Sequence, residues 1–153
     1  MGKSTVHTIG ELMRTAGQDA AQLQDPDVAS LVVHHNQVLG SQLIPGFEAQ
    51  VEELEDGISA VLTLREGTVV QKPVHLCFGM LPEKGVQRIR MSVMLERGSR
   101  IAVLAHCAFP NAVDVQHIMD AHITVGEGAH YSYFERHVHG PDGGVLVYPK
   151  ARV

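Results

Sequence analysis

The chain has 153 residues, of which 44% are hydrophobic and 19% are charged. This composition excludes an intrinsically disordered chain and a coiled coil, both of which carry many more charged residues. A net charge of −5 with scattered basic residues argues against a nucleic-acid partner. No stretch approaches the ~20 apolar residues of a membrane helix, and the first residues lack a signal-peptide core, so we expect a cytoplasmic protein without a membrane partner.

Residues 1–40 carry helical signals. Thr8 and Glu11 have the spacing of a capping box, in which each side chain bonds the other's free backbone N–H. A second helix is expected over residues 25–40, because an aspartate and a proline stand at its start and a glycine stands at its end. The β-branched Val32 and its neighbour leave open an extended conformation after them. We therefore predict an N-terminal helical segment over residues 1–40.

Residues 41–153 change to a period of two, in which apolar and polar residues alternate. Such alternation is typical of strands that bury one face. The alternating runs are separated by short segments rich in glycine and charged residues, which favour turns. These runs cover residues 47–51, 58–64, 89–95, 101–107 and 129–133. The pattern predicts a mainly β domain with short strands.

A weak internal repeat runs through this β region. Its turn glycines are 31 and 30 residues apart, three histidines recur at intervals of 31, and Cys77 nearly superposes on Cys107. The repeated residues are Gly67, Gly98 and Gly128, and His75, His106 and His137. A fixed period with glycine corners favours a β-solenoid, in which each coil buries its inner face against its neighbours. An antiparallel sandwich also has regularly recurring strands, and periodicity alone does not separate the two folds.

Ten histidines and two cysteines suggest a metal site. Cys107 stands at the end of an alternating run and just before Pro110, where a thiol is less shielded than in mid-strand. It also fits a small buried hydrophobe, which is how most free cysteines behave. His117 and His122 would face opposite sides of a strand, so their spacing favours solvated side chains over a compact ligand set.

His137 and His139 would project from one side of a strand, as in pairs that bind Zn, Ni or Fe. The glycine and proline that follow them at once favour a loop location and a solvated pair over a metal-binding pair. The sequence has no phosphate-binding loop, dinucleotide fingerprint, nucleophile elbow, zinc-protease motif or C-x-x-C pair. The residues by themselves give no argument for an enzyme.

Residues 92–139 resemble the core of the SufB/SufD family, the β-solenoid proteins of the Suf iron–sulfur assembly system. Residues 107–110 match a C-x-x-P motif of SufB, and His117 matches the histidine of a following strand. Residues 125–129, followed by the tyrosines of residues 131–133, are similar to a further strand of the family. Weaker similarity before and after this region extends the resemblance to about two-thirds of the chain. The resemblance rests on the order and spacing of the motifs together.

The resemblance implies a right-handed parallel β-helix over residues 41–153, preceded by the short helical region. It implies a non-enzymatic scaffold component of iron–sulfur cluster assembly, holding a transient iron–sulfur cluster. Cys107 is then the expected contact for persulfide or cluster, and His117 and His122 are weaker candidates for metal contacts. The implied partners are a second SufB/SufD-type subunit, or a second copy in a homodimer, and a SufC-type ATPase.

The sequence also departs from the family pattern. His122 stands where SufB has a glutamate, and the family's core continues well past residue 153. The later cluster residues and the helical segment that docks SufC would lie in that missing part, so we expect a truncated or short member. A truncated solenoid exposes a strand edge, which predicts a dimer. Two alternatives stay open: a cupin-like metal-binding β-barrel protein or enzyme, and a purely structural β-helical subunit.

Overall fold

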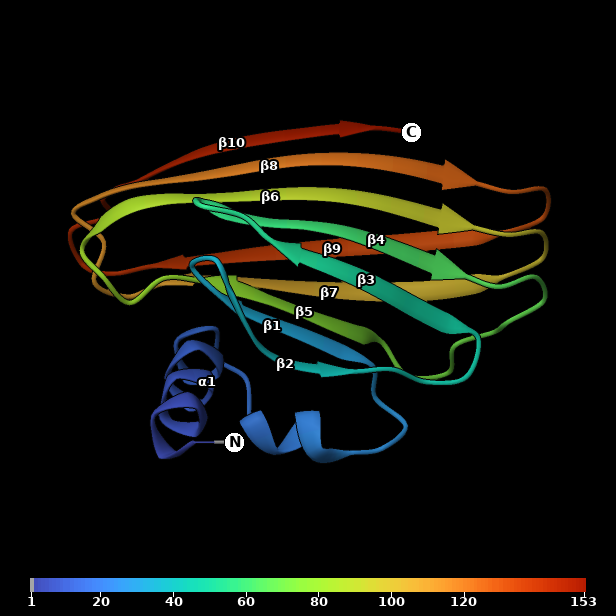
Figure 1. The fold of residues 1–153 in the computed structure, drawn as a ribbon, viewed down its shortest axis with the longest axis horizontal. Coiled ribbons are helices and arrows are strands. Elements are labelled where there is room, and N and C mark those ends of the chain that lie inside the picture. The colour runs from blue at the N-terminus through green and yellow to red at the C-terminus, as the bar shows by residue number, and fades with distance from the viewer. Residues whose placement is uncertain (1) are drawn as a thin grey trace.

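The computed structural model describes residues 2–153, which are built mainly from strands (Figure 1). Its helices are α1 (Lys3–Thr15) and the short 3-10 helix η1 (Ala20–Gln24). Its strands are β1 (Ser30–His34), β2 (Gln37–Gln42), β3 (Phe47–Glu53), β4 (Gly57–Leu64), β5 (Val74–Gly79), β6 (Lys84–Leu95), β7 (Arg100–Phe109), β8 (Asp114–Val125), β9 (His130–His139) and β10 (Val145–Arg152). Neither helix of this part of the chain has the length and apolar character needed to cross a membrane.

The strands form two five-stranded sheets that lie face to face (Figure 1). One sheet has the order β2-β1-β5-β7-β9, and the other has the order β10-β8-β6-β4-β3. From β5 to β10 the chain crosses to the opposite sheet after every strand, and each strand pairs in parallel with the strand two positions later. The strands therefore stack as coils, which confirms the mainly β solenoid. An antiparallel sandwich and a closed barrel are wrong for residues 2–153, because parallel pairs dominate and the two sheets stay separate. The right-handed sense remains a prediction.

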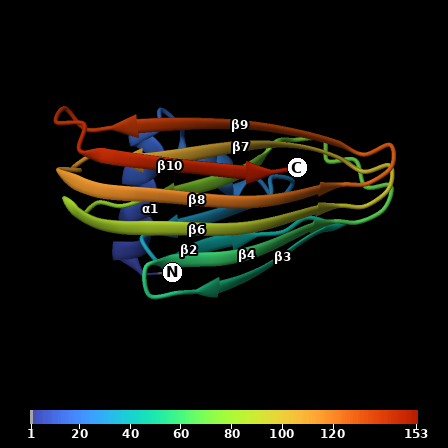
Figure 2. The same ribbon diagram turned by 90° about the horizontal axis from the view of Figure 1, so that it is seen from above.

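Antiparallel hairpins close one end of the stack. β1 pairs with β2, and β3 pairs with β4, so that β2 and β3 cover the sheet edges that the first coil would leave open. At the other end β9 and β10 are the last strands of their sheets, as Figure 2 shows from above. Within residues 2–153, each of these two strands has a neighbour on one side only, which leaves backbone hydrogen-bonding groups free along both edges.

The space between the sheets holds the main hydrophobic core. Inward side chains from both sheets interdigitate there, and the largest fully buried ones include Phe78, Ile89 and Phe109. The corners between strands use glycines in the left-handed region, with φ of 70° at Gly67, 66° at Gly98 and 67° at Gly128. Residues with a β-carbon are disfavoured at such φ values, so the repeated glycines follow from the repeated turn.

The helix expected over residues 25–40 is wrong. Residues 30–34 and 37–42 form β1 and β2 instead, and β1 lies in parallel beside β5. β-Branched Val32 and Val33 suit a strand that is buried on both faces: Val33 points into the core, and Val32 contacts the cluster under α1. The division of the chain at residue 40 remains a prediction.

The first helix exists but begins earlier than its sequence signal. α1 starts at Lys3, and the Thr8 hydroxyl donates to the carbonyl of Ser4 within the helix. The capping box at Thr8 and Glu11 is therefore wrong. Leu12 and Met13 of α1 pack on the outer side of the first sheet, where they meet Cys77. Burial of this apolar face holds the helix in place.

Candidate metal centre

Cys107 points into the space between the two sheets. It alternates along β7 with other inward residues, and no part of it is exposed to solvent. Burial, followed by the nearby charge of Glu135, holds the pKa of this thiol well above its usual value. The thiol therefore stays protonated near neutral pH unless a cation replaces its proton.

β9 brings a carboxylate and an imidazole to this thiol. Cys107 is the register partner of His137, and Glu135 lies two residues before His137 on the same face of β9. Glu135 Oε1 accepts a hydrogen bond from Cys107 Sγ at 3.6 Å and lies 2.6 Å from His137 Nε2. The side chains of Glu135 and His137 are 21% and 22% exposed, so the cluster touches solvent on the β9 side.

Two opposing influences act on the Glu135 carboxyl. Burial by itself would raise its pKa, but the hydrogen bond to His137 and the attraction of that imidazole outweigh burial, and the pKa lies below its usual value. Glu135 is therefore an anion at neutral pH. A buried anion next to a thiol and imidazoles lowers the free energy of a bound cation.

His117 reaches the same place from the opposite sheet. It lies on β8, is fully buried, and packs its ring against Phe109 with the centroids 4.9 Å apart. Burial, the largest cause, lowers the pKa of His117 to about 4, so the ring is neutral at physiological pH. A neutral imidazole is the form that ligates metals.

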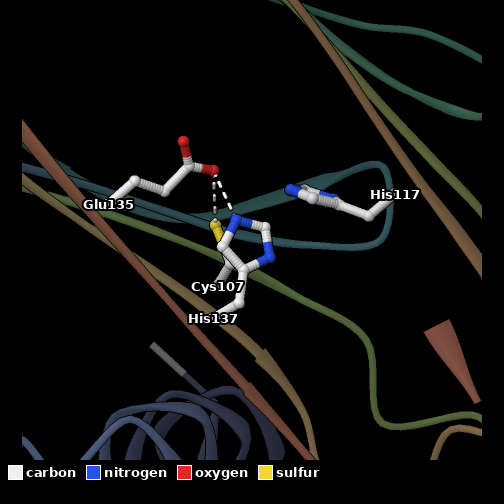
Figure 3. A group of neighbouring side chains, drawn as sticks. All are labelled: Cys107, His117, Glu135 and His137. Carbon is white, nitrogen blue, oxygen red and sulfur yellow. Dashed lines mark hydrogen bonds and ion pairs between the residues drawn. The ribbon is translucent and has the colours of Figure 1, made fainter. Parts of the chain in front are cut away.

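One potential ligand atom from each of Cys107, His117, Glu135 and His137 lies within 4.8 Å of the others (Figure 3). Both ring nitrogens of His117 and Nδ1 of His137 are buried without a hydrogen-bond partner in residues 2–153. Buried polar atoms in proteins are nearly always partnered, and a metal ion at the cluster would partner one of the His117 nitrogens. A thiolate, two imidazoles and a carboxylate suit a borderline ion such as Fe²⁺ or Zn²⁺.

Only two of the three metal-site residues predicted from the sequence lie together in the structure. It brings Cys107 and His117 together, whereas His122 lies exposed on the outer face of β8, on the side opposite to His117. His137 lies on a strand and not in a loop, next to Glu135, which the sequence analysis did not single out. The 30-residue separation of Cys107 and His137, which is close to the repeat length, was the signal that could have linked them.

The sequence comparisons point to one family. The chain is 33% identical over 123 residues to a protein named "Iron-sulfur cluster assembly SufBD family protein" from Methanocaldococcus jannaschii, covering 80% of this chain and 39% of that relative. It is 29% identical over 143 residues to a protein of the same family name from Pyrococcus horikoshii, covering 94% of this chain and 43% of the relative. The chain thus spans about two-fifths of the length of these curated relatives.

Two other comparisons gave no match. No family model matches the chain, and no solved structure matches it. The sequence relatives therefore carry the family relationship, and they confirm the resemblance to the SufB/SufD family.

Proposed function

Because this chain is related to the SufBD family of iron–sulfur cluster assembly proteins, we propose that it takes part in iron–sulfur cluster assembly without catalysing a small-molecule reaction. Iron and sulfur are its cargo and are held at the four-residue cluster of Cys107, His117, Glu135 and His137. The observation that carries the proposal is the meeting of these four ligand atoms within 4.8 Å between the two sheets. The neutral His117 imidazole and the ionised Glu135 carboxylate can bind a cation as they are, and the Cys107 thiol gives up its proton when the cation binds.

Cys107 is the residue that handles sulfur in this proposal. Its thiol donates a hydrogen bond to Glu135 at 3.6 Å, and the thiol proton passes to solvent when a cation binds at the cluster and the thiolate forms. The thiolate then attacks the outer sulfur of a persulfide on a donor protein. A new S–S bond forms at Cys107, the donor's S–S bond breaks, and the donor leaves as a thiolate.

In this proposal the imidazoles of His117 and His137 are iron ligands. His117 on one sheet and His137 on the other approach the thiol from two sides, so an iron ion at the cluster would tie the sheets together. Imidazole and carboxylate are acceptable iron ligands, and a mixed set holds a cluster less tightly than four thiolates do. A weakly held cluster suits a protein that passes its cluster on.

The partners follow from the family and from the free edges of β9 and β10. A second SufB/SufD-type subunit or a second copy of this chain would pair at these edges, and a SufC-type ATPase would complete the assembly. The cytoplasm supplies the reducing conditions that keep Cys77 and Cys107 as the free thiols seen in the structure.

Anaerobic reconstitution with ferrous iron and sulfide tests the proposal. We expect wild type and Cys77→Ala to gain the same iron content and the same visible absorbance, and Cys107→Ala to lose most of both. Cys77 is the matched control, because it is an equally buried cysteine that faces α1 and lies outside the cluster. Equal iron and absorbance in wild type and Cys107→Ala would contradict the role of Cys107. Circular dichroism confirms that both variants are folded.

A parallel variant, His122→Ala, tests the other metal candidate. If the four-residue cluster holds the iron, this exposed residue contributes nothing and the variant loads like wild type. Loss of iron in His122→Ala would move the iron site to the outer face of β8. Absence of iron in every protein, including wild type, would favour the purely structural subunit.

A further inference from the structure

His139 is a second inward histidine of β9 that the four-residue cluster does not use. Its register partner on β7 is Phe109, two residues beyond Cys107, and the Phe109 and His139 ring centroids lie 6.1 Å apart. The rings of His137 and His139 also lie 6.1 Å apart and are nearly perpendicular, at 84°. The H-x-H pair on one strand face, noted in the sequence, is therefore formed.

Two nitrogens of this pair have no partner. Nδ1 of His137 and Nε2 of His139 are both buried and accept or donate no hydrogen bond within residues 2–153. An ion at the four-residue cluster would use one atom of His137, and Nε2 of that ring already lies 2.6 Å from Glu135. Nδ1 on the opposite side of the ring and Nε2 of His139 would still be unpartnered, which is costly for buried polar atoms.

We infer that the solenoid holds a second cation position beside the first, bound by Nδ1 of His137 and Nε2 of His139, with solvent completing its coordination. The inference rests on the proposed function, since it takes the four-residue cluster as the first position. Two imidazoles select a divalent transition ion of borderline softness such as Fe²⁺, Co²⁺, Ni²⁺ or Zn²⁺. His137 would then contact both ions, one through each of its two ring nitrogens.

The two positions differ in chemistry. The first has the Cys107 thiolate and the Glu135 carboxylate, whereas the second has nitrogen ligands from this chain and no sulfur. Cobalt separates them, because a thiolate bound to Co²⁺ gives a sulfur-to-metal charge-transfer band and imidazole does not. A pair of ions joined through one residue also matches a cargo that contains more than one iron atom.

Titration of the metal-free, reduced protein with Co²⁺ tests the inference. We expect wild type to bind about two Co²⁺ per chain, and His139→Ala and His139→Gln to bind about one while keeping the charge-transfer band. His130→Ala is the matched control, since His130 is an exposed histidine of the same strand, and it should still bind two.

The outcomes separate the two proposals. One Co²⁺ per wild-type chain with the charge-transfer band, or two per chain in both His139 variants, would overturn the second position and leave the first intact. Absence of the charge-transfer band in wild type would overturn the first position, and the proposed function with it. Circular dichroism of the His139 variants shows whether a lost ion reflects a lost fold.

Discussion

Cys77 and Cys107 hold nearly equivalent places in the repeat but point to opposite faces of one sheet. The register of β5 and β7 pairs Cys77 with His106 and Phe78 with Cys107, so the two cysteines are offset by one residue. Side chains alternate along a strand, and a one-residue offset moves a side chain to the other face. Cys77 therefore packs under α1 beside Met13, and Cys107 faces the space between the sheets.

Both thiols are predicted to be unreactive in the native, metal-free protein. Burial raises the pKa of Cys77 from 9.0 to about 12, which lowers its thiolate fraction roughly a thousandfold. Cys107 is shielded in the same way. We expect iodoacetamide at about pH 8 to modify both thiols far more slowly in buffer than in urea, as followed by intact mass. The Cys77→Ala variant isolates Cys107, and its rapid native alkylation would mean that the last coil opens readily.

Much of the fold could be predicted from local pattern. The alternating runs correspond to β3, β4, β6, β7 and β9, and the repeated glycines correspond to the corners. β1 and β2 were mistaken for a helix because the start and stop residues of residues 25–40 fit a helix. The conformation of β1 is decided by its pairing with β5, which is far away in sequence, and β2 then pairs with β1.

The candidate site was harder to predict, because it depends on register. His75, His106 and His137 recur at intervals of 31, which suggests that His137 stacks on His106. The structural offset between β7 and β9 is 30, so His137 lies opposite Cys107 and joins it inside. His117 and Glu135 join only because two sheets face each other, and a distance across sheets has no signal in the spacing of one strand.

Two glycine substitutions should move stability in opposite directions. A β-carbon at Gly79 would collide with the backbone carbonyl of Ala108 and lie 2.9 Å from Leu12 Cδ2, so Gly79→Ala should cost about 2 kcal/mol or more. Gly10 lies inside α1 with only Arg14 Nη2 near, at 3.9 Å, so Gly10→Ala should stabilise the protein by about 0.5–1 kcal/mol. Urea unfolding followed by circular dichroism measures both. A neutral effect of Gly79→Ala would mean that the coil and α1 separate easily.

The metal-free protein should lose stability on mild acidification. His106 is 4% exposed, stacks on His75 and lies near Arg136; burial, the largest cause, lowers its pKa from 6.5 to about 4. Below pH 6.5 His106 binds a proton in the unfolded chain, whereas in the folded chain it stays neutral down to about pH 4. The free energy of unfolding therefore falls as the pH drops from 6.5 to 4. One such histidine accounts for at most about 3 kcal/mol.

Urea unfolding at several pH values between 4 and 7 measures this loss. His106→Leu removes the proton-binding group, so its stability should fall less steeply with acidification than that of wild type. Part of the fall should remain, because His117 is buried with a similarly lowered pKa. An unchanged slope in His106→Leu would show that the pair with His75 is protonated without penalty.

The free edges of β9 and β10 predict self-association. Both strands end their sheets, and the outer faces beside these edges carry Phe134, Leu146 and Tyr148 with exposures of 62%, 58% and 51%. Unpaired strand backbones next to exposed apolar side chains favour pairing with a second chain. We expect light scattering after size exclusion to show a dimer at micromolar concentration.

The double variant Phe134→Lys with Leu146→Lys should shift the protein to the monomer, because lysines at a strand edge oppose pairing. Val6→Lys on α1, where the valine is 57% exposed, is the matched control and should stay dimeric. A monomeric wild type would contradict self-association, and a dimer that only Val6→Lys disrupts would place the interface on α1.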